Sequence, residues 1–141
     1  MVTADVSIGD AASRSGCTQA TIRYYEEIDL LAGVARGENG RRVYNQTNIE
    51  RLLLIRRCRD FGLSIEQIRE LTVAIARNAP DCGSVRDLIL THVAALRAKR
   101  LQLRSLEVSL LGLAASCQPD CCVPGADGCR VVVDISKPPS S

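Results

Sequence analysis

The feature that most constrains the fold is a long stretch without proline, residues 84–116, which contains a single glycine, Gly112. Apolar residues recur in it at every seventh position, and these are Ile89, Leu96, Leu103 and Leu110. A helix over this stretch would be roughly 48 Å long at about 1.5 Å per residue, which is more than a small globular core needs. A seven-residue apolar repeat is typical of a two-helix seam, so the stretch predicts a helix that forms a dimer.

Two short helices separated by a tight turn are predicted near the N-terminus. Ser7 is the expected N-cap of the first, with Asp10 in the capping-box position, and the pattern breaks at Ser15-Gly16. Thr18 is the expected N-cap of the second helix. Two short helices joined by a turn that contains glycine form the helix-turn-helix pattern. The second helix carries side chains able to contact a nucleic acid, namely Thr18, Gln19, Thr21, Arg23 and Tyr24.

A β-hairpin and two further helices are predicted next. Asn39-Gly40 is a strong type I′ hairpin signal, and residues 42–44 form a short strand after it. Arginines surround this tip, as in a wing that lies against a DNA backbone; they are Arg36, Arg41 and Arg42. Thr47 with Glu50 predicts a helix to about Phe61, and Ser64 with Gln67 predicts one to about Asn78.

Overall charge does not predict nucleic-acid binding, but its local distribution does. The 18 basic and 16 acidic residues leave a net charge of +2, so any such binding must come from a local cluster. Residues 36–59 contain seven arginines and only two acidic residues. Aromatic residues make up 3% of the chain, which favours helices over a sheet-based fold.

Other classes of protein fit the sequence poorly. With one His, no Cys-x-x-Cys and no glycine-rich phosphate loop, no catalytic set of an enzyme can be assembled. No apolar run approaches the roughly 18 residues of a membrane helix. The N-terminal residues lack the layout of a signal peptide, so we expect a cytoplasmic protein without a membrane partner.

Cysteines are unusually frequent near the C-terminus. Four of the seven fall within the thirteen residues 117–129. An odd count in a non-exported chain argues against a disulfide framework. The clustering instead indicates metal or redox chemistry. Cys17 and Cys58 lie in the predicted helical region and are expected to be small buried apolar residues.

Three strings together resemble the MerR family of bacterial transcription regulators. They are Thr21-Ile-Arg-Tyr-Tyr25, Asn39-Gly-Arg-Arg-Val-Tyr44 and Ile55-Arg-Arg-Cys-Arg-Asp-Phe-Gly-Leu-Ser64. One departure is Asp29, where the family usually has glycine; Asp can adopt the left-handed conformation, so we expect the turn to survive.

The resemblance implies a mainly α fold in three parts. Residues 1–79 would form a winged helix-turn-helix DNA-binding domain with linker helices, residues 80–116 the dimerisation helix of an antiparallel coiled coil, and residues 117–141 a Cys-rich metal-binding loop and tail. It also implies a homodimer that binds promoter DNA with a long −10/−35 spacer. Inducer binding would distort that DNA so that RNA polymerase can use the promoter. The expected DNA contacts are Thr18, Gln19, Thr21, Arg23, Tyr24, Arg36, Arg41, Arg42 and Tyr44.

The resemblance also implies the metal site. Cys82 and Cys117 are 35 positions apart, the offset found in metal-sensing members, and an antiparallel pair would bring Cys82 of one chain to the 117–129 loop of the other. Members that sense copper(I) have Ser at the helix start, so Cys82 implies a divalent ion. Cys82, Cys117 and Cys129 would form a three-thiolate site, with Cys121 or Cys122 as a fourth ligand.

Sulfur ligands narrow the choice of metal. Thiolates select soft ions, so we rank cadmium and lead first, mercury next and zinc close behind. The alternative within the same family is a redox or iron–sulfur sensor, because such members also carry a cysteine-rich C-terminal loop.

Overall fold

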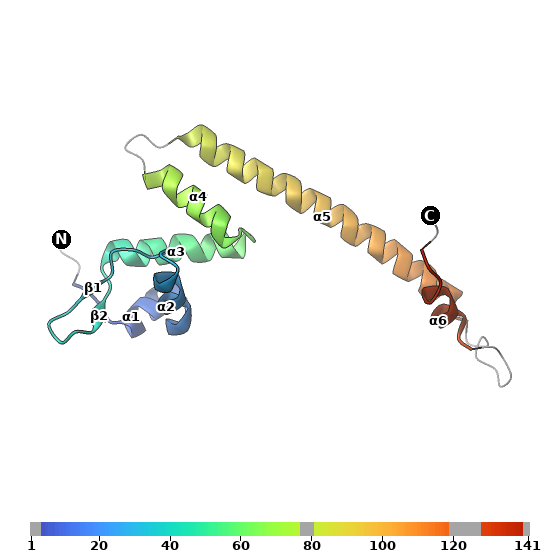
Figure 1. The fold of residues 1–141 in the computed structure, drawn as a ribbon, viewed down its shortest axis with the longest axis horizontal. Helices are drawn as coiled ribbons and strands as arrows, with labels where there is room; N and C mark the ends of the chain where they lie inside the picture. The colour runs from blue at the N-terminus through green and yellow to red at the C-terminus, as the bar shows by residue number, and fades with distance from the viewer. Residues whose placement is uncertain (1–3, 77–80, 119–127, 140–141) are drawn as a thin grey trace. The chain divides into compact units, whose positions relative to one another are not determined.

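The computed structural model describes residues 4–76, 81–118 and 128–139. The chain divides into two compact units, Met1–Ile89 and Leu90–Ser141. As predicted, the described part is mainly helical and contains a long helix near the C-terminus; the short helix that follows it was not predicted (Figure 1). Its elements are α1 (Ile8–Ser15), α2 (Gln19–Glu27), β1 (Ala35–Arg36), β2 (Arg42–Val43), α3 (Gln46–Asp60), α4 (Ile65–Ala76), α5 (Cys82–Ser116) and α6 (Arg130–Ile135).

The helix-turn-helix is confirmed with its predicted caps. The Ser7 hydroxyl accepts a hydrogen bond from the Asp10 amide at 3.2 Å and donates to the Asp10 carboxylate at 2.8 Å. Gly16 ends α1 in the left-handed conformation, with φ of 69°. The Thr18 hydroxyl accepts from the Thr21 amide at 3.1 Å, which fixes the start of α2. Asp29 has a φ of 56°, so the turn after α2 survives without glycine, as expected.

The wing is a two-stranded antiparallel hairpin, but its turn differs from the prediction. The register pairs Ala35 with Val43 and Arg36 with Arg42. The Gly40 amide donates to the Gly37 carbonyl at 2.9 Å, so the central residues of the turn are Glu38 and Asn39. Gly40 has a φ of 74°, whereas Asn39 lacks the positive φ that a type I′ turn requires. The prediction of a type I′ turn is therefore wrong: one left-handed residue, Gly40, closes a three-residue loop.

The capping of α3 also differs from the prediction. Asn45, rather than Thr47, is the N-cap: its side chain accepts from the Asn48 amide at 2.9 Å, and the Asn48 side chain accepts from the Asn45 amide at 3.0 Å. Two Asn side chains thus form a reciprocal capping box that starts the helix at Gln46. The predicted pair at the start of α4, Ser64 with Gln67, is confirmed by reciprocal hydrogen bonds of 2.9 and 3.2 Å.

Helix α5 begins two residues before the predicted start. The Asp81 carboxylate accepts from the amides of Gly83 at 3.1 Å and Ser84 at 3.2 Å, so the helix includes Cys82. Its last residue is Ser116, as predicted.

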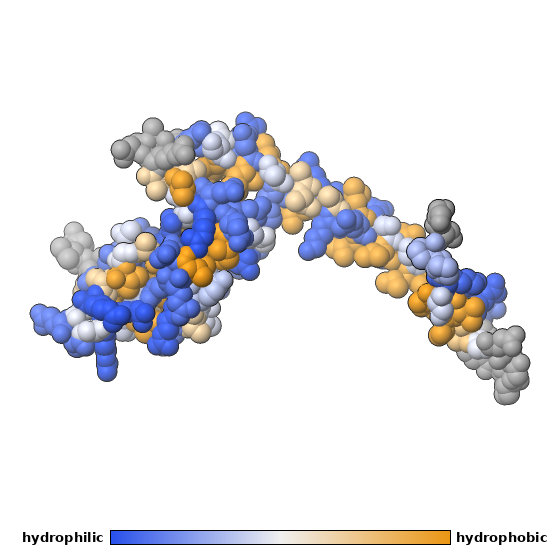
Figure 2. Space-filling view, in the orientation of Figure 1, coloured by the Kyte–Doolittle hydropathy of each residue, from blue (hydrophilic) through white to orange (hydrophobic). Residues whose placement is uncertain are grey.

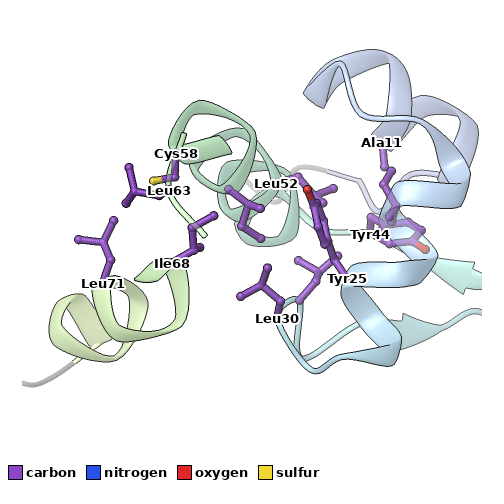
Figure 3. Close-up of a cluster of buried hydrophobic side chains, with 12 residues drawn as sticks. Ala11, Tyr25, Leu30, Tyr44, Leu52, Cys58, Leu63, Ile68 and Leu71 are labelled. Carbon is purple, nitrogen blue, oxygen red and sulfur yellow. The ribbon is translucent and has the colours of Figure 1, made fainter. Parts of the chain in front are cut away.

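The core of the first unit lies between α1, α2, α3, α4 and the hairpin. Figure 3 shows Tyr25, Tyr44 and Leu52 close together, while Ile68 and Cys58 belong to the part where α3 meets α4. Cys58 is buried, as expected, and Cys17 is partly buried against this core.

Helix α5 contains no buried residue. Apolar side chains lie on its surface in Figure 2, and seven of them are Ile89, Leu96, Leu101, Leu103, Leu106, Leu110 and Leu111. Across the parts of the chain that the structure describes, no helix combines the length and apolarity needed to cross a membrane.

Candidate nucleic-acid interface and metal centre

Helix α2 presents most of its predicted contact residues at the surface. Gln19, Arg23 and Tyr24 are exposed, and Tyr24 is 48% exposed. The hydroxyl groups of Thr18 and Thr21 form a hydrogen bond of 2.8 Å with each other. These two hydroxyls therefore stabilise the start of α2, while the exposed side chains of Gln19 and Arg23 are available to a ligand.

Arginines from α2 and from the hairpin surround one hollow of about 550 Å³, which we name the arginine hollow. Its arginines are Arg23, Arg36, Arg41 and Arg42, and Asp5 contributes the acidic group of its lining. The structure thus brings together four residues predicted as DNA contacts from two separate segments. Among the described lining residues, the other predicted contacts of α2 do not occur.

Hydrogen bonds shape the hairpin side of the arginine hollow. The Arg36 guanidinium donates to the Gly40 carbonyl at 2.9 Å, and the Arg41 amide donates to the Asn39 side chain at 3.1 Å. Hydrophilic side chains cover this hairpin on the face that Figure 2 shows. Guanidinium groups concentrated at one surface attract phosphate groups, and each guanidinium can bind a phosphate through two N–H donors.

Tyr44 does not belong to this surface, contrary to the prediction. It is 0% exposed, and its hydroxyl donates to the Glu26 carboxylate. Burial, and then the hydrogen bond to Glu26, raises the pKa of Tyr44. Tyr44 directly follows β2, and its side chain belongs to the buried core cluster with Ala11, Tyr25 and Leu52, so it is not exposed to a ligand in this conformation (Figure 3).

Sequence reasoning missed Glu26. Its second carboxylate oxygen forms an ion pair with the Nε atom of Arg42 at 2.6 Å, and the Glu26 side chain is only 11% exposed. The available signal was an acidic residue at the end of a helix otherwise predicted to face DNA.

The seven arginines of residues 36–59 do not form one cluster. Three belong to the arginine hollow. The other four lie on α3 and contact the protein itself. Three of them donate hydrogen bonds to backbone carbonyls: Arg51 to the Leu30 carbonyl at 3.5 Å, Arg56 to the Ser15 carbonyl at 3.2 Å and Arg59 to the Leu63 carbonyl at 2.8 Å. The guanidinium of the fourth, Arg57, lies 5.0 Å from the centre of the Phe61 ring. Burial lowers the pKa of Arg51. The charge run in the sequence therefore contains both interface and structural residues.

The described cysteines of the predicted metal site lie at helix ends. Cys82 is the first residue of α5 and is exposed. Cys117 directly follows the last residue of α5 and is exposed, and Cys129 is the partly buried N-cap residue of α6. Cys121 and Cys122 lie outside the described residues. Within residues 4–76, 81–118 and 128–139 of one chain, no three Cys, His, Asp or Glu side chains come together as metal ligands. The sulfur donors suit a soft ion, but one chain does not assemble a site from the residues described.

Comparisons with known families match most of the chain. A family described as "MerR HTH family regulatory protein" matches residues 6–74, and one described as "MerR, DNA binding" matches residues 49–113. The HTH-type transcriptional regulator HmrR of Sinorhizobium medicae is 32% identical over 94% of this chain and 87% of its own length. "Heavy metal-dependent transcription regulator 2" of Rhizobium meliloti is 34% identical over 82% of each protein.

Solved structures of transcription regulators have the same fold as this chain. The transcription regulator PbrR691 from Ralstonia metallidurans, crystallised with lead(II), is 33% identical, with a TM-score of 0.81 over 93% of this chain and 99% of that chain. The fold is also shared by a regulator from Bacillus megaterium in complex with mercury(II), which is 23% identical, with a TM-score of 0.71 over 94% of this chain and 100% of that chain.

Proposed function

The chain belongs to the MerR family of helix-turn-helix regulatory proteins, which are DNA-binding regulators and not enzymes, and on that premise we propose that it is a metal-responsive transcriptional regulator. The observation that carries the DNA-binding part is the arginine hollow, where α2 and the wing present four guanidinium groups together. The relatives named as heavy-metal-dependent and the lead(II) complex of a regulator 33% identical support the metal response.

The proposed DNA contacts divide by chemistry. Arg23, Arg36, Arg41 and Arg42 contact phosphates, which sets the register of the protein on the duplex. Gln19, Thr21 and Arg23 reach base edges, and Thr18 and Tyr24 lie beside them on α2. All of these residues belong to the proposed DNA-binding domain, residues 1–79.

The proposed active form is a homodimer joined through α5, within residues 80–116. The apolar residues of its seven-residue repeat are about half exposed or more in one chain, from 48% at Leu96 to 63% at Leu110. Burial of these side chains against a second copy removes them from water, which favours association. Antiparallel pairing places the start of α5 in one chain beside the end of α5 in the other.

The proposed metal site combines the two chains of this dimer. Cys82 of one chain joins Cys117 and Cys129 of the other, and Cys121 or Cys122 supplies a fourth thiolate from residues 117–141. Three or four thiolates favour cadmium or lead, then mercury, with zinc close behind. Each thiol loses its proton on binding, so affinity rises with pH until the thiols are ionised.

The proposed output is a change in DNA shape in the bacterial cytoplasm. The dimer binds a promoter with a long −10/−35 spacer, and the metal-bound form bends and untwists the spacer so that RNA polymerase can engage both elements. Such a deformation costs on the order of 1–6 kcal/mol, which protein–DNA contacts supply.

The metal site is tested by an anaerobic titration of the reduced, full-length protein with cadmium, lead, mercury and zinc. Thiolate-to-metal charge-transfer absorption is followed in the ultraviolet for wild type, for Cys82→Ser and for the matched control Cys17→Ser. We expect a stoichiometric endpoint that weakens in Cys82→Ser and is unchanged in Cys17→Ser, since Cys17 lies in the helix-turn-helix. The absence of any Cys82-dependent endpoint would contradict the proposed site and favour redox or iron–sulfur sensing in the same family.

A further inference from the structure

Glu26 holds two residues of the wing with one carboxylate. One oxygen accepts the Tyr44 hydroxyl, and the other pairs with Nε of Arg42 at 2.6 Å. Glu26 is the last residue but one of α2, so these contacts join the helix that carries Arg23 to strand β2. The Glu26 side chain is only 11% exposed. Any other orientation of the carboxylate would break its contacts with both Tyr44 and Arg42.

Tyr44 is itself fixed, which makes it a firm support for Glu26. Its ring is 0% exposed, and its backbone exchanges two hydrogen bonds of 2.9 Å with Val6. The hydroxyl therefore meets the Glu26 carboxylate from a position that the core determines. The orientation of the carboxylate, and through it the Arg42 side chain, follows from this buried contact.

The ion pair occupies only one edge of the Arg42 guanidinium. An arginine has five N–H donors in a planar fork, and Nε supplies one of them. The Arg42 side chain is 43% exposed and lines the arginine hollow. Among the described residues, Glu26 is the ion-pair partner of Arg42, so the terminal nitrogens can bind a ligand while the side chain is anchored at Nε.

We infer that Glu26 is a positioning residue for DNA binding: it holds Arg42 as a pre-oriented donor to a DNA phosphate at the junction of α2 and the wing. This inference rests on the proposed DNA-binding function. A flexible arginine loses side-chain freedom when it binds a phosphate, and an arginine already held in place loses less. Glu26 therefore strengthens DNA binding although its own charge repels DNA.

The charge of Glu26 and its positioning of Arg42 predict opposite effects on DNA affinity, so an experiment can distinguish them. If only charge mattered, removal of the acidic partner of Arg42 would tighten DNA binding, because it removes a repulsion from the phosphates. If Glu26 positions Arg42, its removal weakens binding, and the loss disappears once Arg42 is absent. If Glu26 only supported the fold, the loss would persist without Arg42.

The experiment is a double-mutant cycle with full-length protein. The probe is the tightest duplex that wild-type protein selects from random-sequence DNA, and dissociation constants are measured at several salt concentrations. The variants are Glu26→Ala, Arg42→Ala and the double variant, with Glu27→Ala as the matched control because it removes a neighbouring exposed acidic residue of α2. Glu26→Gln, which keeps an oxygen for Tyr44, serves if Glu26→Ala does not fold, as judged by thermal unfolding.

We expect Glu26→Ala to weaken binding about tenfold or more, Glu27→Ala to leave it equal or tighter, and Glu26→Ala to have no weakening effect in the Arg42→Ala background. Equal or tighter binding by Glu26→Ala, or a loss that persists without Arg42, overturns the inference. If wild-type protein selects no duplex, the proposed DNA-binding function fails instead, so the two failures are distinguishable.

Discussion

Replacement of Leu103 by alanine should weaken the dimer because this side chain lies in the proposed seam of α5. Leu103 is 58% exposed in one chain. Complete burial of a leucine contributes about 1.5–3 kcal/mol, so covering the exposed part contributes about 0.9–1.7 kcal/mol per chain. In a two-fold dimer the substitution occurs twice, which doubles this to about 2–3.5 kcal/mol, or about a 30- to 300-fold rise in the dissociation constant.

Leu101 provides a matched control in the same helix. It is 65% exposed, and two residues at about 100° each place it on the far side of the helix from Leu103. Leu101→Ala therefore removes the same atoms with the same change in helix propensity, yet should leave the dimer unchanged.

Sedimentation equilibrium of the full-length variants over a range of concentrations measures both dissociation constants. A dimer that weakens equally in Leu101→Ala and Leu103→Ala, or in neither, would refute the assignment of the seam to the seven-residue repeat.

Two further predictions concern single side chains of the first unit. Arg23→Ala should weaken binding to the selected duplex about tenfold or more and lower the salt dependence of binding by about one phosphate contact. The control Arg57→Ala, which removes a cation stacked on Phe61, should change neither the affinity nor its salt dependence. Both are measured by titrations at several salt concentrations, and equal effects of the two substitutions would remove Arg23 from the interface. Burial raises the pKa of the Cys58 thiol, so at any given pH less of this thiol is present as thiolate. Cys58 should therefore react with iodoacetamide more slowly than the exposed Cys82. Mass spectrometry of the reduced protein measures both reaction rates, and faster labelling of Cys58 would contradict its burial.

Local patterns predicted much of the architecture. Ser7, Thr18 and Ser64 cap the helices assigned to them, and Asp29 adopts the left-handed conformation expected of it. Each of these features depends on residues within about four positions, so short-range hydrogen bonding decides it. The end of α5 at Ser116 followed in the same way from an uninterrupted helical pattern.

Two local predictions failed because a neighbouring alternative was better satisfied. Asn45 and Asn48 cap each other at the start of α3, which leaves the Thr47 signal inside the helix. Gly40 takes the left-handed position of the wing turn alone, since a three-residue loop needs only one such residue.

The composition of the candidate interface was decided by contacts between distant residues. Glu26 meets Arg42 and Tyr44 across 16 and 18 positions, and Arg56 meets Ser15 across 41. The sequence by itself predicted a mainly helical protein with a DNA-binding domain, a long helix with a seven-residue apolar repeat, and cysteines at the ends of that helix. Only the tertiary structure decided which arginines line the arginine hollow and which bind the protein's own carbonyls, because the partner of an arginine depends on what the folded chain brings within reach.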